Sequence, residues 1–198
     1  MEMNGWKHFC TITRHKYLVM KHCFKVGLYW QGLVHDMSKY SWAEFSVGCK
    51  YYQGTRSPNN AEREEKGYSS AWLHHKGRNK HHYEYWIDYS LTKPGLAGMK
   101  MPKKYVVEMF MDRVAASKNY LKDQYKNDSA LQYYLSGLEH QVMHDDTRKV
   151  LEEMLYMLAE KGEKETFAYI KNQILATKDY ETKNKGIENV SGKMREFR

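Results

Sequence analysis

Apolar residues recur along most of the chain with the three-to-four-residue spacing of an amphipathic helix. The clearest stripe is formed by Val106, Met109, Phe110 and Val114, and it predicts a helix over residues 102–122. Sustained alternation of apolar and polar residues is absent from the sequence, and its three prolines fall in expected connections. The pattern therefore predicts an all-α fold, a helical bundle.

Caps, stops and apolar stripes place the other helices. They are expected over residues 14–26, 28–39, 41–52 (opened by a capping box at Ser41), 61–66, 70–76, 80–89, 129–143, 146–162 and 163–176. Residues 53–60 and 77–79 are expected to be breaks, and residues 92–102 a flexible loop that could close over a site. We expect one helical domain over residues 1–176 and a polar, flexible tail over residues 177–198.

Composition narrows the class of protein. The 198 residues are 41% hydrophobic and 14% aromatic, enough for a packed core without staples. No apolar run approaches the roughly 20 residues of a membrane span. The first ten residues lack the apolar stretch of a secretory signal, and three cysteines without metal-ligand spacing fit free thiols. These features favour a cytoplasmic protein.

The net charge of +8 favours an anionic partner, for which we expect a small-molecule substrate. The alternative, of about equal weight, is that the excess charge is only a solvated surface. Nucleic acid is not predicted, because the chain has no long Arg-rich run. Neither a membrane partner nor an oligomeric state is indicated.

Ten histidines raise the question of a metal, because they are clustered rather than scattered. His8, His15 and His22 recur every seven residues, and four more histidines fall within residues 74–82. The pair His35-Asp36 is followed by Lys39, one helical turn away, which could hold an anionic ligand. Taken alone, the pair equally fits an Asp that fixes a His tautomer in a core.

The segment of residues 74–84 is the densest group of candidate ligands. In a continuous helix His75, Asn79 and His82 would share one face, and His81 stands close behind His82 as an alternative. Imidazoles with a carboxylate suit Zn, Fe, Mn or Co. The competing interpretation is a surface patch or an aromatic cluster with Trp72.

Asp112 stands among apolar residues and before two alanines. Such a position predicts a partly buried carboxylate that needs a partner. On this evidence alone, a salt bridge to an adjacent helix explains it better than a metal.

Together these residues give an ordered series: a lone His, a His-Asp pair, a single His, a His-His pair and a closing Asp. This order resembles the HD superfamily of metal-dependent phosphohydrolases, especially its dinuclear HD-GYP-like arrangement. The chain also resembles an uncharacterised bacterial and phage family over about residues 9–176. That resemblance is carried by GLYWQGLVHDMSKY at residues 27–40, Ser57-Pro58-Asn59, and WLHHKGRNKHHYEYW at residues 72–86.

The resemblance implies an HD-like bundle and a metal-dependent phosphohydrolase acting on a phosphate ester or nucleotide. It implies one or two divalent ions (Mn, Zn, Fe, Co or Ni) held by His15, His35, Asp36, His75, His82 and Asp112. Catalytic roles fall to Asp36, Lys39 and His81, and phosphate binding to Arg56, Arg78 and Lys80.

Two features depart from well-studied HD hydrolases. Only 20 residues separate His15 from His35, and Tyr83-Glu84-Tyr85 follows the His-His pair where Gly-Tyr-Pro is expected. Both argue against cyclic-dinucleotide hydrolysis. They also leave open which of His74 or His75, and which of His81 or His82, would contact a metal; the shared helical face favours His75 and His82. The alternatives to a hydrolase are a non-haem di-iron oxygenase on the same scaffold and a metal-stabilised helical domain without enzyme activity.

Overall fold

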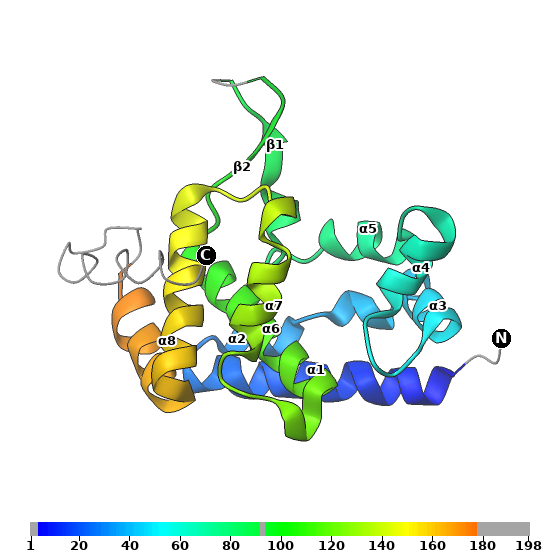
Figure 1. Cartoon of the computed structure of the whole chain (residues 1–198), viewed down its shortest axis with the longest axis horizontal. Helices are drawn as coiled ribbons and strands as arrows, with labels where there is room; N and C mark the ends of the chain where they lie inside the picture. Colours follow the sequence, from blue (N-terminus) through cyan, green and yellow to red (C-terminus); the bar gives the residue numbers. More distant parts are fainter. Residues whose placement is uncertain (1–3, 92–93, 178–198) are drawn as a thin grey trace.

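Helix α1 (Gly5–Lys25) runs along one side of the molecule in the computed structural model, which describes residues 4–91 and 94–177 (Figure 1). The helix begins nine residues before the predicted start at residue 14. Its buried stripe is His8, Ile12, His15, Val19, His22 and Cys23. Three of its six residues are histidines, spaced seven residues apart in the sequence. A search for apolar residues alone therefore does not reveal the first turns of the helix.

The hydrophobic core lies where the C-terminal half of α1 meets three later helices. These are α6 (Lys103–Leu121), α7 (Ser129–Ser136) and α8 (Asp145–Tyr169). Fully buried core side chains include Val19, Phe110, Tyr134, Met154 and Leu158. The α6 prediction of 102–122 is therefore confirmed, whereas α7 ends seven residues before the predicted residue 143.

A second group of helices lies beside α1, with Gly32 against its C-terminal half and Phe45 against its N-terminal half. It comprises α2 (Tyr29–Val34), the short 3₁₀ helix η1 (Met37–Tyr40), α3 (Trp42–Tyr51), α4 (Pro58–Lys66) and α5 (Ser70–Lys76). The buried carboxylate of Glu62 accepts hydrogen bonds from Ser69 and Ser70, which ties α4 to the start of α5. The predicted helix over 28–39 is wrong in its middle, since α2 ends before His35.

Residues 80–89 do not form the predicted helix. They contain the 3₁₀ helix η2 (Tyr83–Trp86) and strand β1 (Ile87–Tyr89), which pairs antiparallel with β2 (Leu96–Gly98) in a projecting hairpin (Figure 1). Aromatic and β-branched residues favour this extended backbone. Gly98 allows close packing, because a Cβ there would lie 2.6 Å from the backbone nitrogen of His144.

The fold is thus mostly helical, as predicted, with one short hairpin in the described part of the chain. That hairpin occupies part of the segment predicted as a flexible loop over 92–102, and residues 92–93 lie outside the description. The predicted tail over 177–198 lies outside it almost entirely.

Toward the C-terminal end of α8, Gly162 (φ 76°, ψ 177°) interrupts the helix at the predicted break. Three further short helices complete the described elements: η3 (Lys122–Gln124), η4 (Leu138–His140) and the π-helical turn η5 (Ile170–Ile174). Across the described residues, the helices fall short of the length and apolar character that crossing a bilayer requires.

Candidate metal centre

Four buried histidines and two aspartates converge between the core helices and the α3–α5 group. His15 comes from the middle of α1 and Asp112 from the middle of α6, and the His15 Nε2 atom lies 2.9 Å from Asp112 Oδ1. Both helices are long and cross here, so the two side chains have a fixed backbone beneath them.

The adjacent pair His35-Asp36 reaches the same point because the backbone leaves the helix. His35 is extended (φ −50°, ψ 129°) and Asp36 is left-handed (φ 55°, ψ 23°). Asp is among the few non-Gly residues that tolerate this conformation. Lys16 Nζ donates to the carbonyl oxygens of Leu33 and His35 and so holds the end of α2.

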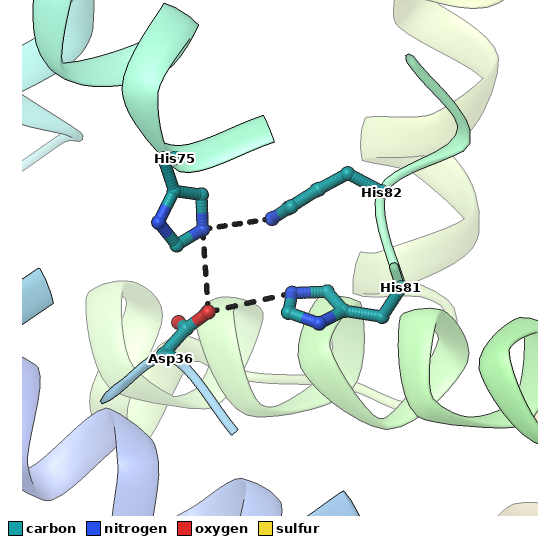
Figure 2. A group of neighbouring side chains, drawn as sticks. All are labelled: Asp36, His75, His81 and His82. Carbon is teal, nitrogen blue, oxygen red and sulfur yellow. Dashed lines mark hydrogen bonds and ion pairs between the residues drawn. The ribbon is translucent and has the colours of Figure 1, made fainter. Parts of the chain in front are cut away.

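Asp36 stands at the centre, with each carboxylate oxygen facing a different pair of imidazoles. Its Oδ2 atom lies 3.5 Å from His15 Nε2 and 3.3 Å from His35 Nε2. Its Oδ1 atom lies 3.2 Å from His75 Nε2 and 3.4 Å from His81 Nε2 (Figure 2). We call the group around Oδ2, formed by His15, His35 and Asp112, the Oδ2 half-site. The group around Oδ1, which contains His75 and His81, is the Oδ1 half-site.

His82 completes the Oδ1 half-site. Its Nε2 atom lies 2.9 Å from that of His75, and Figure 2 shows the rings of His75 and His81 turned toward Asp36 and the ring of His82 turned toward His75. Burial, then the neighbouring His81 and His75, hold the pKa of His82 well below its usual range. His82 is therefore neutral at physiological pH, the form that donates a lone pair to a metal.

Several of these polar atoms are buried and make no hydrogen bond of good geometry, although His15 Nε2 is paired with Asp112 and Asp36 Oδ2 with Lys39. They are Nε2 of His15, His35 and His81 and both carboxylate oxygens of Asp36. Leaving such groups unsatisfied is costly, and here the unsatisfied atoms all point at one another. A cation in each half-site would satisfy them. Each half-site, counted with Asp36, contains four donor residues, and the donor atoms within each group lie within 4.8 Å of one another.

The donor spacing also suits metals. Bonds of roughly 2.0–2.2 Å to His nitrogen and carboxylate oxygen place neighbouring ligands about 2.8–3.6 Å apart at octahedral or tetrahedral angles. The closest donor contacts, from 2.9 Å to 3.5 Å, fall in that range. Buried groups of His, Asp and Glu in this chain could thus hold a metal ion.

The charges of the cluster are strongly coupled. Burial alone would raise the pKa of Asp36, but His35 and Lys39 outweigh it and hold that pKa well below the usual range. Burial would lower the pKa of His35, and the surrounding acids, Asp36 first, raise it well above normal instead. A metal entering the cluster therefore competes with protons on the imidazoles.

Two glutamates hold the imidazoles from behind, and the sequence analysis assigned neither of them to the site. Glu44 accepts from Nδ1 of both His74 and His75, each at 2.7 Å. Glu108 Oε1 lies 2.9 Å from His35 Nδ1 and 3.1 Å from His81 Nδ1.

Glu44 was predicted to belong to a capping box, but the Ser41 side chain forms no cap hydrogen bond. Glu108 could have been found by the signal that singled out Asp112, an acid inside a run of buried apolar residues.

The structure brings every predicted metal ligand together: His15, His35, Asp36, His75, His82 and Asp112. His81, predicted to be catalytic, faces Asp36 Oδ1 directly and lies among the candidate ligands. Lys39 Nζ lies 2.5 Å from Asp36 Oδ2 at the edge of the cluster.

Three predicted phosphate-binding residues make other contacts. Arg56 forms a two-pronged ion pair with Glu64 on α4. Arg78 donates to the carbonyl oxygen of His74, and Lys80 lies over the ring of Tyr85. Their phosphate-binding role stays a prediction.

His8 and His22, the other two histidines of the series spaced seven residues apart on α1, pack against aromatic rings. His8 packs against Phe45 and Tyr52, and His22 packs edge-on against Phe167. Spacing alone could not separate His15 from these two neighbours, since all three are buried on the same face of α1.

Comparison with curated proteins and with solved structures finds no match for the chain. The model of a family of unknown function, DUF5662, matches residues 4–157, a range that contains every residue of the cluster. The match covers more than half of the sequence, and the chain therefore belongs to the DUF5662 family.

Proposed function

We propose that the chain is a metal-dependent phosphohydrolase of HD-like type, acting on a phosphate ester or nucleotide. The observation that carries the proposal is the Asp36 carboxylate, whose two oxygens each face a separate set of buried imidazole nitrogens. This arrangement supports two divalent ions sharing Asp36, with His15, His35 and Asp112 on one and His75, His81 and His82 on the other.

The donor set fits Mn, Fe, Co, Ni or Zn better than Mg or Ca, because imidazole nitrogen outnumbers oxygen. Bound ions of this kind lower the pKa of a coordinated water and polarise a phosphoryl oxygen. The chain's own contribution is to fix the donors. The Glu44 and Glu108 carboxylates accept hydrogen bonds from Nδ1–H of His75 and His35, so that Nε2 of each ring would be the atom to bind a metal.

Lys39 supplies the positive charge for an anionic substrate. Burial would lower its pKa, but Asp36 and Asp112 raise it, so the ammonium group is charged at any physiological pH. Its side chain is 30% exposed, which gives an incoming phosphate access to it beside Asp36. The net charge of +8 favours the same class of ligand.

Metal analysis of the purified chain, followed by hydrolysis assays, tests this proposal. We expect Mn, Fe, Co, Ni or Zn to be bound and metal-dependent hydrolysis of bis(p-nitrophenyl) phosphate or p-nitrophenyl phosphate, lost on chelation and restored by metal. His35→Ala and Asp36→Ala should each lose metal and activity while the chain stays folded.

Other outcomes separate the alternatives. Two iron atoms with visible absorbance and O₂ consumption, without hydrolysis, would favour the di-iron oxygenase. Bound metal with neither activity would favour a metal-stabilised binding domain. A folded chain that binds none of these metals would refute the metal centre itself.

A further inference from the structure

Glu108 sits on the side of the cluster away from Asp36 and contacts a histidine of each half-site. One oxygen, Oε1, lies 2.9 Å from His35 Nδ1 and 3.1 Å from His81 Nδ1. The three side chains are almost wholly shielded from water, with exposed fractions of 6% for Glu108, 0% for His35 and 2% for His81. Water cannot replace this carboxylate as the acceptor.

The two histidines belong to different halves of the site. His35 Nε2 faces Asp36 Oδ2, whereas His81 Nε2 faces Asp36 Oδ1. Their rings lie side by side, with centroids 4.3 Å apart and planes 36° apart. Glu108 and Asp36 thus hold the same two rings from opposite ends.

This geometry fixes the tautomer of both rings. An ionised carboxylate only accepts hydrogen bonds, so both rings carry a proton on Nδ1 and direct Nε2, from which a metal would displace any second proton, toward the half-sites. His35, His81 and Glu108 are also a group that could hold an ion by themselves. An ion there would bind Nδ1 of rings whose Nε2 atoms already serve the half-sites, which would require two fully deprotonated imidazoles. A shared carboxylate acceptor is the simpler chemistry.

We propose that Glu108 is a positioning residue that couples the two metal half-sites. An ion in one half-site fixes one ring, which fixes Glu108 and in turn orients the other ring for the second ion. By linkage the effect is reciprocal, so either ion favours the other. The inference rests on the metal centre of the proposed function and does not depend on the reaction catalysed there.

Glu44 provides a matched control. It is also a buried glutamate behind the histidines, but it contacts His74 and His75 and so serves only the Oδ1 half-site. Gln at position 108 removes the negative charge, so that one weaker, neutral acceptor oxygen remains for both Nδ1–H groups, and it puts a donor amide in the place of Oε2. Gln at position 44 removes the same negative charge behind a single half-site, where His74 and His75 are each held by a different oxygen.

The experiment titrates the metal-depleted full chain with Zn²⁺ or Mn²⁺ by calorimetry and counts bound ions by native mass spectrometry. For the unmodified chain we expect two bound ions. The second ion should bind at least as tightly as it would if the two half-sites did not influence each other. Glu108→Gln should weaken both ions by about 10- to 100-fold, the loss typical of a residue that orients a ligand. Glu44→Gln should weaken one ion and leave the other within about twofold of the unmodified chain.

A spectroscopic readout separates positioning from a general structural role. The ¹⁵N shifts of the His35 and His81 rings should show protonated Nδ1 in the unmodified chain, with at least one ring changed in Glu108→Gln. If Glu108→Gln does not fold, Glu108→Asp keeps the acceptor at shorter reach and should weaken both ions together.

Loss of only one ion in Glu108→Gln, or two ions bound with unchanged affinities, would overturn the coupling. So would an unmodified chain that binds a single ion or none. Coupled binding of two ions without hydrolysis would leave this inference standing while refuting the proposed reaction.

Discussion

At the scale of single residues, Asp36 combines two properties that substitution can separate. Its backbone is left-handed, and its carboxylate serves both half-sites. Asn shares the tolerance of Asp for left-handed backbone, whereas Ala costs roughly 1–2 kcal/mol there. Asp36→Asn should therefore avoid the backbone strain of Asp36→Ala and unfold less readily than that variant, yet bind neither ion tightly, as elemental analysis and thermal unfolding would show.

Asp36→Ala should lose both metal and stability, which makes it the comparison for Asp36→Asn. If Asp36→Asn keeps its full metal content, the shared carboxylate is not a ligand and the centre is wrongly placed.

Asp112 belongs to one half-site only. Its Oδ1 atom lies 2.9 Å from His15 Nε2 and 3.5 Å from His35 Nε2. Asn is a neutral and poorer donor, so Asp112→Asn should weaken one ion by at least about 10- to 100-fold and spare the other. A titration with Zn²⁺ or Mn²⁺ checks this. Reduced stability with unchanged affinity would show instead an ion-pair partner of His15.

His22 should contribute to acid sensitivity independently of the metal centre. Burial, then the charge of Lys118, lowers its pKa to about 4, against an opposing contribution from Glu163. The unfolded chain, with a His pKa of roughly 6.5, takes up the proton first as the pH falls. Stability is therefore lost between about pH 6.5 and pH 4, by on the order of 2–3 kcal/mol.

The variant His22→Gln removes the titrating group and leaves the metal cluster unchanged. Its free energy of unfolding, measured with denaturant across this pH range, should fall less steeply than that of the unmodified chain. Parallel curves would rule out His22 as the cause.

At the scale of elements, the sequence predicted helices best where the buried stripe is apolar. The α6 and α3 predictions agree with the structure to within about a residue at each end, as helix ends generally allow. The start of α1 was missed because histidines occupy its stripe, and residues 80–89 were misassigned because aromatic residues suit either structure.

The predicted ligands meet for reasons that the sequence only partly shows. The ordered His and Asp series named side chains that the structure brings together, but a continuous helix through His35 and Asp36 would not have directed both at one point. Their convergence depends on the left-handed backbone of Asp36. Glu44 and Glu108 reach the histidines only because helices distant in the sequence pack together. Spacing along the chain carries no signal for such contacts.

The crossing of α1 and α2 should control the position of His35. A Cβ on Gly32 would lie 3.1 Å from Cys23 Cβ and 3.2 Å from the Met20 backbone. The backbone of α1 cannot move aside for the new methyl group, so Gly32→Ala should push α2 away from α1 and lower the free energy of unfolding by about 1–3 kcal/mol. This loss exceeds the gain of up to ~1 kcal/mol from the higher helix propensity of Ala. Affinity for the ion at His35 should fall as well.

Leu33→Ala, on the exposed face of the same helix, is the control and should change stability by less than about 0.5 kcal/mol. Calorimetric titration and denaturant unfolding of both variants make the comparison. A Gly32→Ala chain that is more stable and binds metal normally would show that the crossing is not tight.

At the scale of the whole molecule, the apolar core and the α3–α5 group are distinct. The core cluster draws on α1, α6, α7 and α8, and no residue of the fully described range 42–76 belongs to it. Buried apolar side chains in that range are few, namely Cys49, Tyr51 and Ala71. The polar cluster lies between the two parts, with candidate ligands from both, so a bound metal should act as the link that the core does not provide.

Removing metal should therefore loosen the molecule unevenly. Hydrogen exchange of the metal-depleted chain should rise in residues 35–82, while the core segments of α6 and α8 keep their protection. Metal at 100 times its dissociation constant should add about 2.7 kcal/mol of stability. At roughly 2–4 °C per kcal/mol for a chain of this size, the midpoint of thermal unfolding should rise by about 5–10 °C. Exchange that changes equally in α6 and α5, or does not change at all, would show that packing alone joins the two parts.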